Sequence, residues 1–361
     1  MSRPTLLLPL LAIAALLSLA TAGTLLIARL ATPQLAAHLA FALGVLPLIL
    51  AAMGYFVPVL TRGAAPGLAA WWPPLLAWVA GLVAVLAFAG DFSPGGINLA
   101  AALGVLAAAG LGGWTLERTR RMLGPRHPGL DWYLAALGCL LLALLAVLLM
   151  PLFPAQRHGL RLFHLHANLL GFVGLAALGT LQVLLPTCLG RADPDASVRL
   201  RRDLKWALAG VLLIAVGSSA MLPASASALA PAVALLGAAA YAFVVARMFR
   251  AWLSQFGRAM FQAHGAAPSL AAAALGLLGL LGFGVAHGFG WLPAPPAVAG
   301  FVVAFLLPLV SGAAAHLLPV WLRPGAQGPW HRASRDRLNR WGGVRGVLLL
   351  LLGLMIAAAA S

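Results

Sequence analysis

Residues 161–186 read RLFHLHANLLGFVGLAALGTLQVLLP, an apolar run long enough to cross a bilayer that also contains His164, His166 and Asn168. Hydrocarbon has no water to satisfy polar side chains, so imidazoles in such a run serve as metal ligands, proton carriers or hydrogen-bond partners between helices. Both histidines lie near the start of the run, where a place in the hydrated membrane interface is the alternative. We take His164 and His166 as the centre of the candidate site.

The composition indicates a polytopic membrane protein, because 63% of the 361 residues are hydrophobic and only 8% are charged. We expect an all-α membrane helical bundle of about 11 (11–12) transmembrane helices, forming a single integral membrane domain over residues 1–361 in contact with the lipid bilayer. Residues 1–30 hold either the first span or an uncleaved signal anchor. The apolar runs place the spans near 5–28, 35–60, 68–90, 97–117, 131–152, 162–187, 204–223, 228–250, 268–290, 297–321 and 343–360.

The formal net charge of +16 arises from basic residues confined to short loops, so it predicts membrane orientation and no nucleic-acid partner. Placing the N-terminus and the loops after the even-numbered spans on one side collects 20 of the 23 Lys and Arg residues there. That side is then cytoplasmic, with the N-terminus inside and the C-terminus periplasmic, in a bacterial-type inner (plasma) membrane. Only Arg29, Arg157 and Arg161 lie opposite. The two cysteines form no CxxC motif and predict no thiolate metal site.

A repeat is visible at the ends of three spans, which close with Pro58, Pro186 and Pro319, each followed by an arginine a few residues later. The prolines are 128 and 133 residues apart (186 − 58 and 319 − 186). His38 and His166 each precede their proline by 20 residues. This spacing predicts four-helix units related by duplication, near residues 34–161, 162–295 and 296–361, the last incomplete. The alternative is that any helix end of this kind prefers Leu-Pro and Arg.

In this topology His38, His164, His166 and His287 all lie at the outer end of their spans. We expect them to be metal or cofactor ligands. His316, inside the tenth span, is either a further metal ligand or an interhelical hydrogen-bond partner. Since few acidic residues occur within the spans, the Asp and Glu relay that is usual in proton pumps is missing.

His164 and His166 are two residues apart and point about 200° apart on a helix, so they do not easily share one metal on one face. Either they serve two neighbours, one on each side of the helix, or one of them coordinates while the other packs. Asn168 shares a face with His164, where it is placed to fix the ring tautomer from outside the ligand set. Neutral imidazoles in a low-dielectric site suit haem iron or copper.

The motif HLHANLLGFVG at residues 164–174, followed by Leu-Leu-Pro186, resembles the histidine-bearing spans of the haem-copper oxidase subunit I superfamily. It also resembles their small relatives, the NnrS-type haem and copper membrane proteins linked to nitric oxide metabolism. The resemblance implies a fold of three pseudo-equivalent groups of four helices. It also implies that His38 is a haem ligand, that haem b is bound, and that copper is a possible second cofactor.

The sequence departs from that family in its active-site motifs. It has no His-Pro-Glu-Val-Tyr span, no adjacent histidines in the seventh span and no His-x-His at the start of the tenth. We therefore expect a degenerate relative in respiratory or nitric-oxide/nitrite metabolism, with a possible redox or respiratory partner and without oxygen reductase activity. A permease that uses the outer histidines for a metal or small molecule, and a non-catalytic assembly partner of a respiratory complex, remain alternatives. The sequence assigns no catalytic residue.

Arg157 and Arg161 lie on the outer side, where positive charge is normally depleted. A haem held by histidines at this depth would direct its propionates outward, and arginine pairs carboxylates bidentately. We expect the two arginines to bind the propionates, with contact to lipid phosphates as the alternative.

Overall fold

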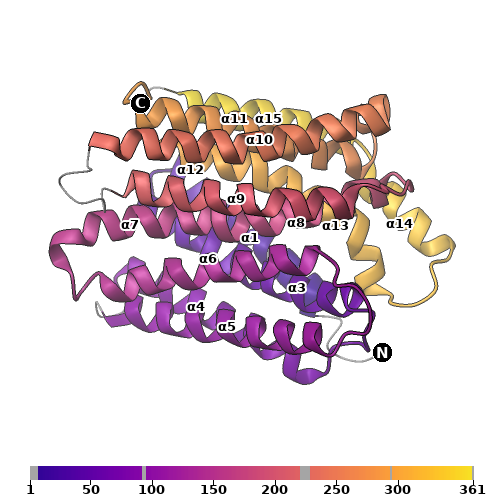
Figure 1. The fold of residues 1–361 in the computed structure, drawn as a ribbon, viewed down its shortest axis with the longest axis horizontal. Coiled ribbons are helices and arrows are strands. Elements are labelled where there is room, and N and C mark those ends of the chain that lie inside the picture. Colours follow the sequence, from indigo (N-terminus) through magenta and orange to yellow (C-terminus); the bar gives the residue numbers. More distant parts are fainter. Residues whose placement is uncertain (1–6, 92–94, 220–227, 293–294, 360–361) are drawn as a thin grey trace. The chain divides into compact units, whose positions relative to one another are not determined.

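The computed structural model describes residues 7–91, 95–219, 228–292 and 295–359. Across these ranges the chain consists of helices and connecting turns, with no strand, so the expected all-α membrane helical bundle is confirmed (Figure 1). Ten helical segments among the described residues are long and apolar enough to cross a membrane.

The seventh predicted span, near 204–223, is not among these ten segments and corresponds to α9 (Ala196–Ser218). Its first turns carry Arg199, Arg201, Arg202, Asp203 and Lys205, so its apolar part is short. The end of the predicted span falls on residues 220–227, outside the described ranges.

The chain forms two compact units, one made of residues 1–176 and 211–234 and the other of residues 177–210 and 235–361. Their boundaries differ from those expected for the repeat. The prediction of one domain built from four-helix repeats stays a prediction.

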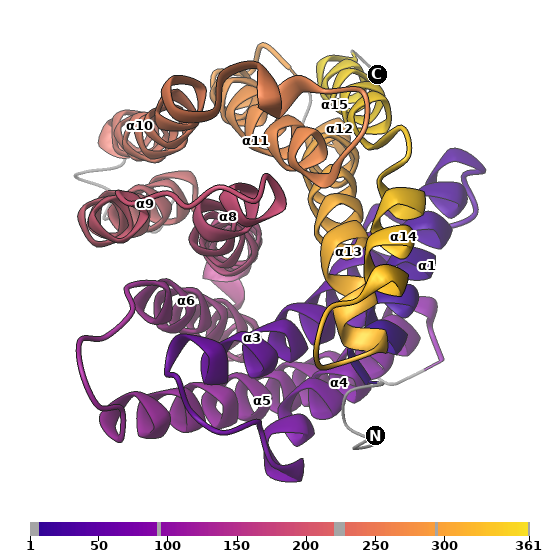
Figure 2. The ribbon, with the colours of Figure 1, turned by 90° about the vertical axis from the view of Figure 1, so that its right-hand side faces the viewer.

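The first unit contains the helices that carry His38 and His164. Helix α4 packs against α5, α5 against α6, and α6 against α7 and η5, while α1 and α4 both contact η2. Figure 2 shows α4 and α5 side by side. The elements are α1 (Leu7–Ile27), α2 (Pro33–His38), η2 (Leu39–Val45), α3 (Leu46–Leu60), η3 (Leu68–Trp71), α4 (Trp72–Ala89), α5 (Gly95–Arg120), α6 (Gly129–Leu149), η4 (Pro154–Gln156), α7 (Arg157–His166) and η5 (Ala167–Gly174).

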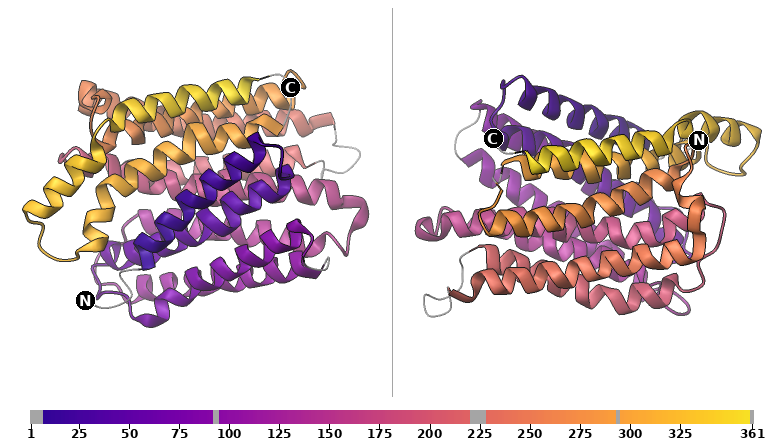
Figure 3. Two further views of the ribbon diagram at one scale, coloured as in Figure 1. Left: turned by 180° about the vertical axis from the view of Figure 1, so that it is seen from behind. Right: turned by 90° about the horizontal axis from the view of Figure 1, so that it is seen from above.

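In the second unit α11 packs against both α13 and α15, and α14 against α13. The course of α11 beside α15 can be followed in orange and yellow in Figure 3. The remaining elements are α8 (Leu175–Cys188), α10 (Ala230–Phe256), η7 (Gly257–Phe261), α11 (Ala266–Gly288), α12 (Pro295–Gly300), η8 (Phe301–Leu306), α13 (Leu307–Leu322), α14 (Pro329–Asn339) and α15 (Gly342–Ala358). Helices α8, α9 and α10 each cross from one unit to the other.

Three elements, η2, η5 and η8, are π-helices, in which the backbone bonds skip one residue more than in an α-helix. They begin 19, 19 and 18 residues before Pro58, Pro186 and Pro319 (58 − 39, 186 − 167 and 319 − 301). The same irregularity thus occurs at nearly the same place in each segment of the proposed repeat. The duplication itself stays a prediction.

Glycines let neighbouring helices approach these π-helices closely. A Cβ at Gly81 of α4 would collide with the backbone of Ala42 in η2, and a Cβ at Gly276 of α11 would collide with the backbone of Ala304 in η8. Small residues at such points allow helix backbones to pack without lipid between them.

Candidate functional site

The first unit brings His38 and His164 together, although they are far apart in the sequence. The two imidazole rings are nearly parallel, with an interplanar angle of 10° and centroids 6.5 Å apart. Both side chains are half-buried. Two imidazoles that bind one metal from opposite sides through nitrogens at about 2.0 Å have centroids roughly 6 Å apart. The observed separation suits one metal shared by the two rings.

Each ring is anchored through Nδ1. The Nδ1–H of His38 donates to the carbonyl oxygen of Gln34 at 2.8 Å, one turn back in α2. The Nδ1–H of His164 donates to the carbonyl oxygen of Ala143 in α6 at 3.0 Å. Because carbonyl oxygens only accept, both bonds place the proton on Nδ1 and leave the Nε2 lone pair to bind a metal. A backbone carbonyl on the other ring nitrogen is the usual support of a metal-binding histidine.

Asn168 and Phe88 complete the immediate surroundings of the pair. The Nδ2 of Asn168 donates to the backbone oxygen of His164 at 3.1 Å and lies 3.2 Å from its Nδ1. With the proton on Nδ1, the same amide faces the Nε2 acceptor at 3.5 Å, a long contact that a metal on Nε2 would replace. The Ala143 carbonyl, rather than Asn168, therefore sets the tautomer of His164, because two donors cannot bond to each other. The ring of Phe88 stacks on that of His38 with centroids 4.2 Å apart, which restricts the orientation of His38.

His166 points to a different neighbour, as expected for a residue two positions from His164. Its Nδ1 lies 2.9 Å from the carbonyl oxygen of Leu162 and 3.0 Å from the Oγ of Ser218 in α9. The Ser218 hydroxyl itself donates to the carbonyl of Ile214 at 2.7 Å, so its oxygen accepts from the His166 ring. His166 thus ties α7 to α9, and it does not share the ring pairing of His38 and His164.

The other two predicted histidine ligands belong to the second unit. His287 is exposed near the end of α11, and its Nδ1–H donates to the carbonyl of Leu292 at 3.1 Å. His316 is half-buried in α13, and its backbone oxygen accepts from Arg335 Nε at 3.2 Å. Their assignment as metal ligands stays a prediction.

Arg157 and Arg161 lie one turn apart on α7, in the helix that carries His164. Both side chains are exposed. Within the described part of the chain, neither guanidinium has a hydrogen bond or an ion pair. Their bidentate donor groups are therefore free to bind an anionic ligand or lipid phosphate.

Two of the three π-helices, η2 and η5, adjoin histidines, which the hydropathy pattern does not predict. η2 begins directly after His38, and η5 directly after His166. π-helical turns are rare and occur frequently at functional sites. For η2 and η8 the sequence contains a signal, because Pro47 and Pro308 each lie two residues after the π-helix. Proline lacks the backbone N–H that an α-helical hydrogen bond at that position would need. η5 has no such proline.

The donor set limits which metal the pair can hold. No group of three or more His, Cys, Asp or Glu side chains is placed to bind a metal ion in the residues that the structure describes. Zinc sites take three or four protein ligands, so the histidine pair does not resemble one. Haem brings four nitrogen ligands of its own and needs only one or two from the protein.

Comparisons with known proteins give no family to which the chain can be assigned. No family model, no curated protein and no solved structure matches it.

Proposed function

We propose that this chain is an integral membrane protein that binds haem b, which His38 and His164 would hold through their imidazole rings. The proposal rests on one observation above the others, the near-parallel rings 6.5 Å apart. The two Nδ1 anchors support it, because they leave Nε2 of both rings unprotonated, as a metal ligand requires.

The number of ligands favours haem over a bare copper ion. Copper(II) prefers four ligands in a square arrangement, whereas the pair offers two. Copper(I) held by two imidazoles is the alternative that the same geometry admits. In either case His38 and His164 hold the metal, and Asn168 and Phe88 keep the rings in place.

Haem held by these two histidines would supply one-electron transfer. The chain's residues would then hold the ligand rings rigidly, which keeps structural change on electron transfer small. This favours an electron-carrying role in respiratory or nitric-oxide/nitrite metabolism over oxygen reduction. The missing oxidase motifs agree with that choice.

The test is a visible absorption spectrum and a metal analysis of the full-length chain purified from membranes. We expect a Soret band in the wild type and its loss in both His38→Ala and His164→Ala, since each removes one axial ligand. The matched control is His158→Ala, an exposed histidine of the same helix as His164, which should keep its haem.

Three outcomes are informative. Loss of haem in both variants but not in the control supports the proposal. Copper without a Soret band, lost in the same two variants, would keep the ligand pair and replace haem by copper. A colourless, metal-free wild type would refute metal binding and leave the permease and assembly-partner alternatives.

A further inference from the structure

A second polar site lies in the unit formed by residues 177–210 and 235–361, between the basic ends of α9 and α10. A cavity of about 650 Å³ opens there. Four arginines dominate its wall, which also includes Asp195 and Ser254: Arg199, Arg202, Arg247 and Arg250. We call this space the arginine cavity. No part of the proposed haem function uses them.

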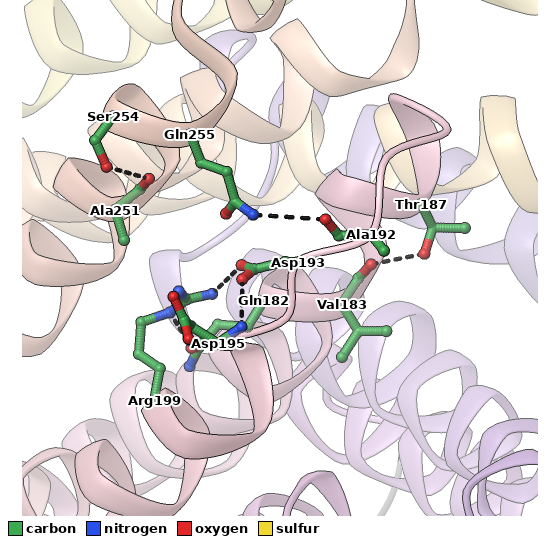
Figure 4. A network of polar contacts seen from close by, with 10 residues as sticks. All are labelled: Gln182, Val183, Thr187, Ala192, Asp193, Asp195, Arg199, Ala251, Ser254 and Gln255. Atoms are coloured by element: carbon green, nitrogen blue, oxygen red, sulfur yellow. Dashed lines mark hydrogen bonds and ion pairs between the residues drawn. The ribbon is translucent and has the colours of Figure 1, made fainter.

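One wall of the arginine cavity is fixed by a buried ion pair. Arg199 Nη2 lies 2.5 Å from Asp193 Oδ2, and the two side chains are only 5% and 1% exposed. Arg199 Nε also donates to the Oε1 of Gln182 at 2.9 Å (Figure 4). Burying two charges is favourable only when the geometry and the additional hydrogen bonds are good, as they are here. The position of Arg199 is therefore set before any ligand binds.

A second buried carboxylate orients two further arginines. Asp203 is completely buried, and its Oδ1 accepts from Arg202 Nε at 3.0 Å and also from Arg247 Nη2. The guanidinium of Arg247 lies over the Phe243 ring, 4.6 Å from its centroid. One negative charge thus holds two positive charges at the cavity.

The cavity region keeps a surplus of positive charge. Its four arginines face three carboxylates, those of Asp193, Asp195 and Asp203, which leaves one positive charge (4 − 3). Arg250 is exposed and has no partner among the described residues. The Arg202 side chain is half exposed, and only its Nε is used in the ion pair. Orientation rules account for arginines at this end of the spans, but not for buried carboxylates that hold them around a cavity.

We propose that the arginine cavity binds a phosphate group, carried either by an anionic lipid headgroup or by a soluble phosphate anion. The N–H groups of guanidinium match phosphate oxygens and form charge-assisted hydrogen bonds with them. Basic pockets between membrane helices on the cytoplasmic side bind anionic headgroups in this way. Arg202 and Arg250 supply the unused donors, and one phosphate diester charge balances the surplus.

The experiment measures thermal unfolding of the full-length chain in a neutral detergent. Phosphatidylglycerol is added in one arm, phosphatidylcholine in the second, and inorganic phosphate against chloride at equal ionic strength in the third. The test variant is Arg202→Gln with Arg250→Gln, which leaves the Arg199–Asp193 and Arg247–Asp203 pairs in place. The matched control is Arg191→Gln with Arg258→Gln, two exposed arginines that do not line the cavity but remove the same charge.

We expect phosphatidylglycerol to raise the unfolding temperature of the wild type and the control, and phosphatidylcholine to leave it unchanged. The test variant should need about tenfold more phosphatidylglycerol for the same shift, because it lacks two charge-assisted contacts. A shift with inorganic phosphate but not with lipid, again reduced in the test variant alone, assigns the cavity to a soluble anion. The proposal is overturned if neither compound shifts the wild type, or if test and control variants respond alike.

Discussion

At His164 a single backbone carbonyl, that of Ala143, decides which ring nitrogen can bind a metal. The sequence predicts His164 and His38 as ligands because polar side chains in apolar spans need a partner. It contains no signal for the Ala143 carbonyl, because any residue type at that position presents the same backbone oxygen. Asn168 was correctly placed near His164, but its role as the group that sets the tautomer was assigned from helical spacing alone, which cannot show a competing acceptor on α6.

A second prediction for single residues concerns Arg157 and Arg161. Both guanidiniums are exposed and have no partner among the described residues. If they bind the haem propionates, Arg157→Ala with Arg161→Ala should weaken haem retention and lower the midpoint potential. The sign follows from charge: removing nearby positive charge stabilises the oxidised iron relative to the reduced iron. A redox titration of wild type and variant measures it. An unchanged potential with full haem content would instead favour contact with lipid phosphates.

At the scale of elements, hydropathy predicted the helices well because burial in hydrocarbon requires long apolar runs. Hydropathy does not predict that η2, η5 and η8 are π-helices. It depends on side chains alone and is the same whether a backbone N–H bonds to the carbonyl four residues back, as in an α-helix, or five residues back, as in a π-helix. Pro47 and Pro308 are local causes visible in the sequence. η5 has no such proline, and it packs closely on α6, where a Cβ at Gly171 would come within 2.6 Å of the Cys139 Cβ.

The π-helix after His38 leads to a prediction about helix rotation. Inserting one alanine directly after His38, ahead of η2, should turn His38 by about 100° relative to α3, because η2 already accommodates one residue more than an α-helix. The ring would then no longer face His164, so haem content should fall to that of His38→Ala. Inserting one alanine directly after Gly300, ahead of η8, is the control and should retain haem, because Ala299 there occupies the position of the histidine. Equal haem content in the two insertion variants would contradict a role of the η2 register in positioning His38.

At the scale of the whole molecule, orientation in the membrane is the property that groups the histidines. The 20 to 3 division of basic residues predicts a cytoplasmic N-terminus and a periplasmic C-terminus. A reporter fused after Ser361 should therefore be active as a periplasmic protein. A cytoplasmic result would require an even number of crossings, and α9, with its charged first turns, is the helix to reconsider.

The predicted layer of outer histidines stays a prediction, although two of its members lie close together. His38 and His164 meet within one unit, whereas His287 belongs to the other and remains a predicted ligand. The topology predicted from the sequence places His38, His164, His166 and His287 at one level of the membrane. Residues at the same level can still lie on helices that do not touch. Whether two histidines meet depends on how their helices pack. Around His38 and His164 the packed elements are α4, α6 and η2.

The most direct measurement of the central claim is the electron paramagnetic resonance spectrum of the oxidised full-length protein. The planes of the two imidazoles differ by only 10°. If both rings bound one haem iron, this near-parallel arrangement would make two of the iron d orbitals unequal in energy. The spectrum should show a rhombic low-spin ferric signal that is lost in His38→Ala and in His164→Ala and unchanged in His158→Ala. A wild type with only high-spin haem, or a rhombic signal that persists in either ligand variant, would contradict the assignment of His38 and His164 as the axial pair.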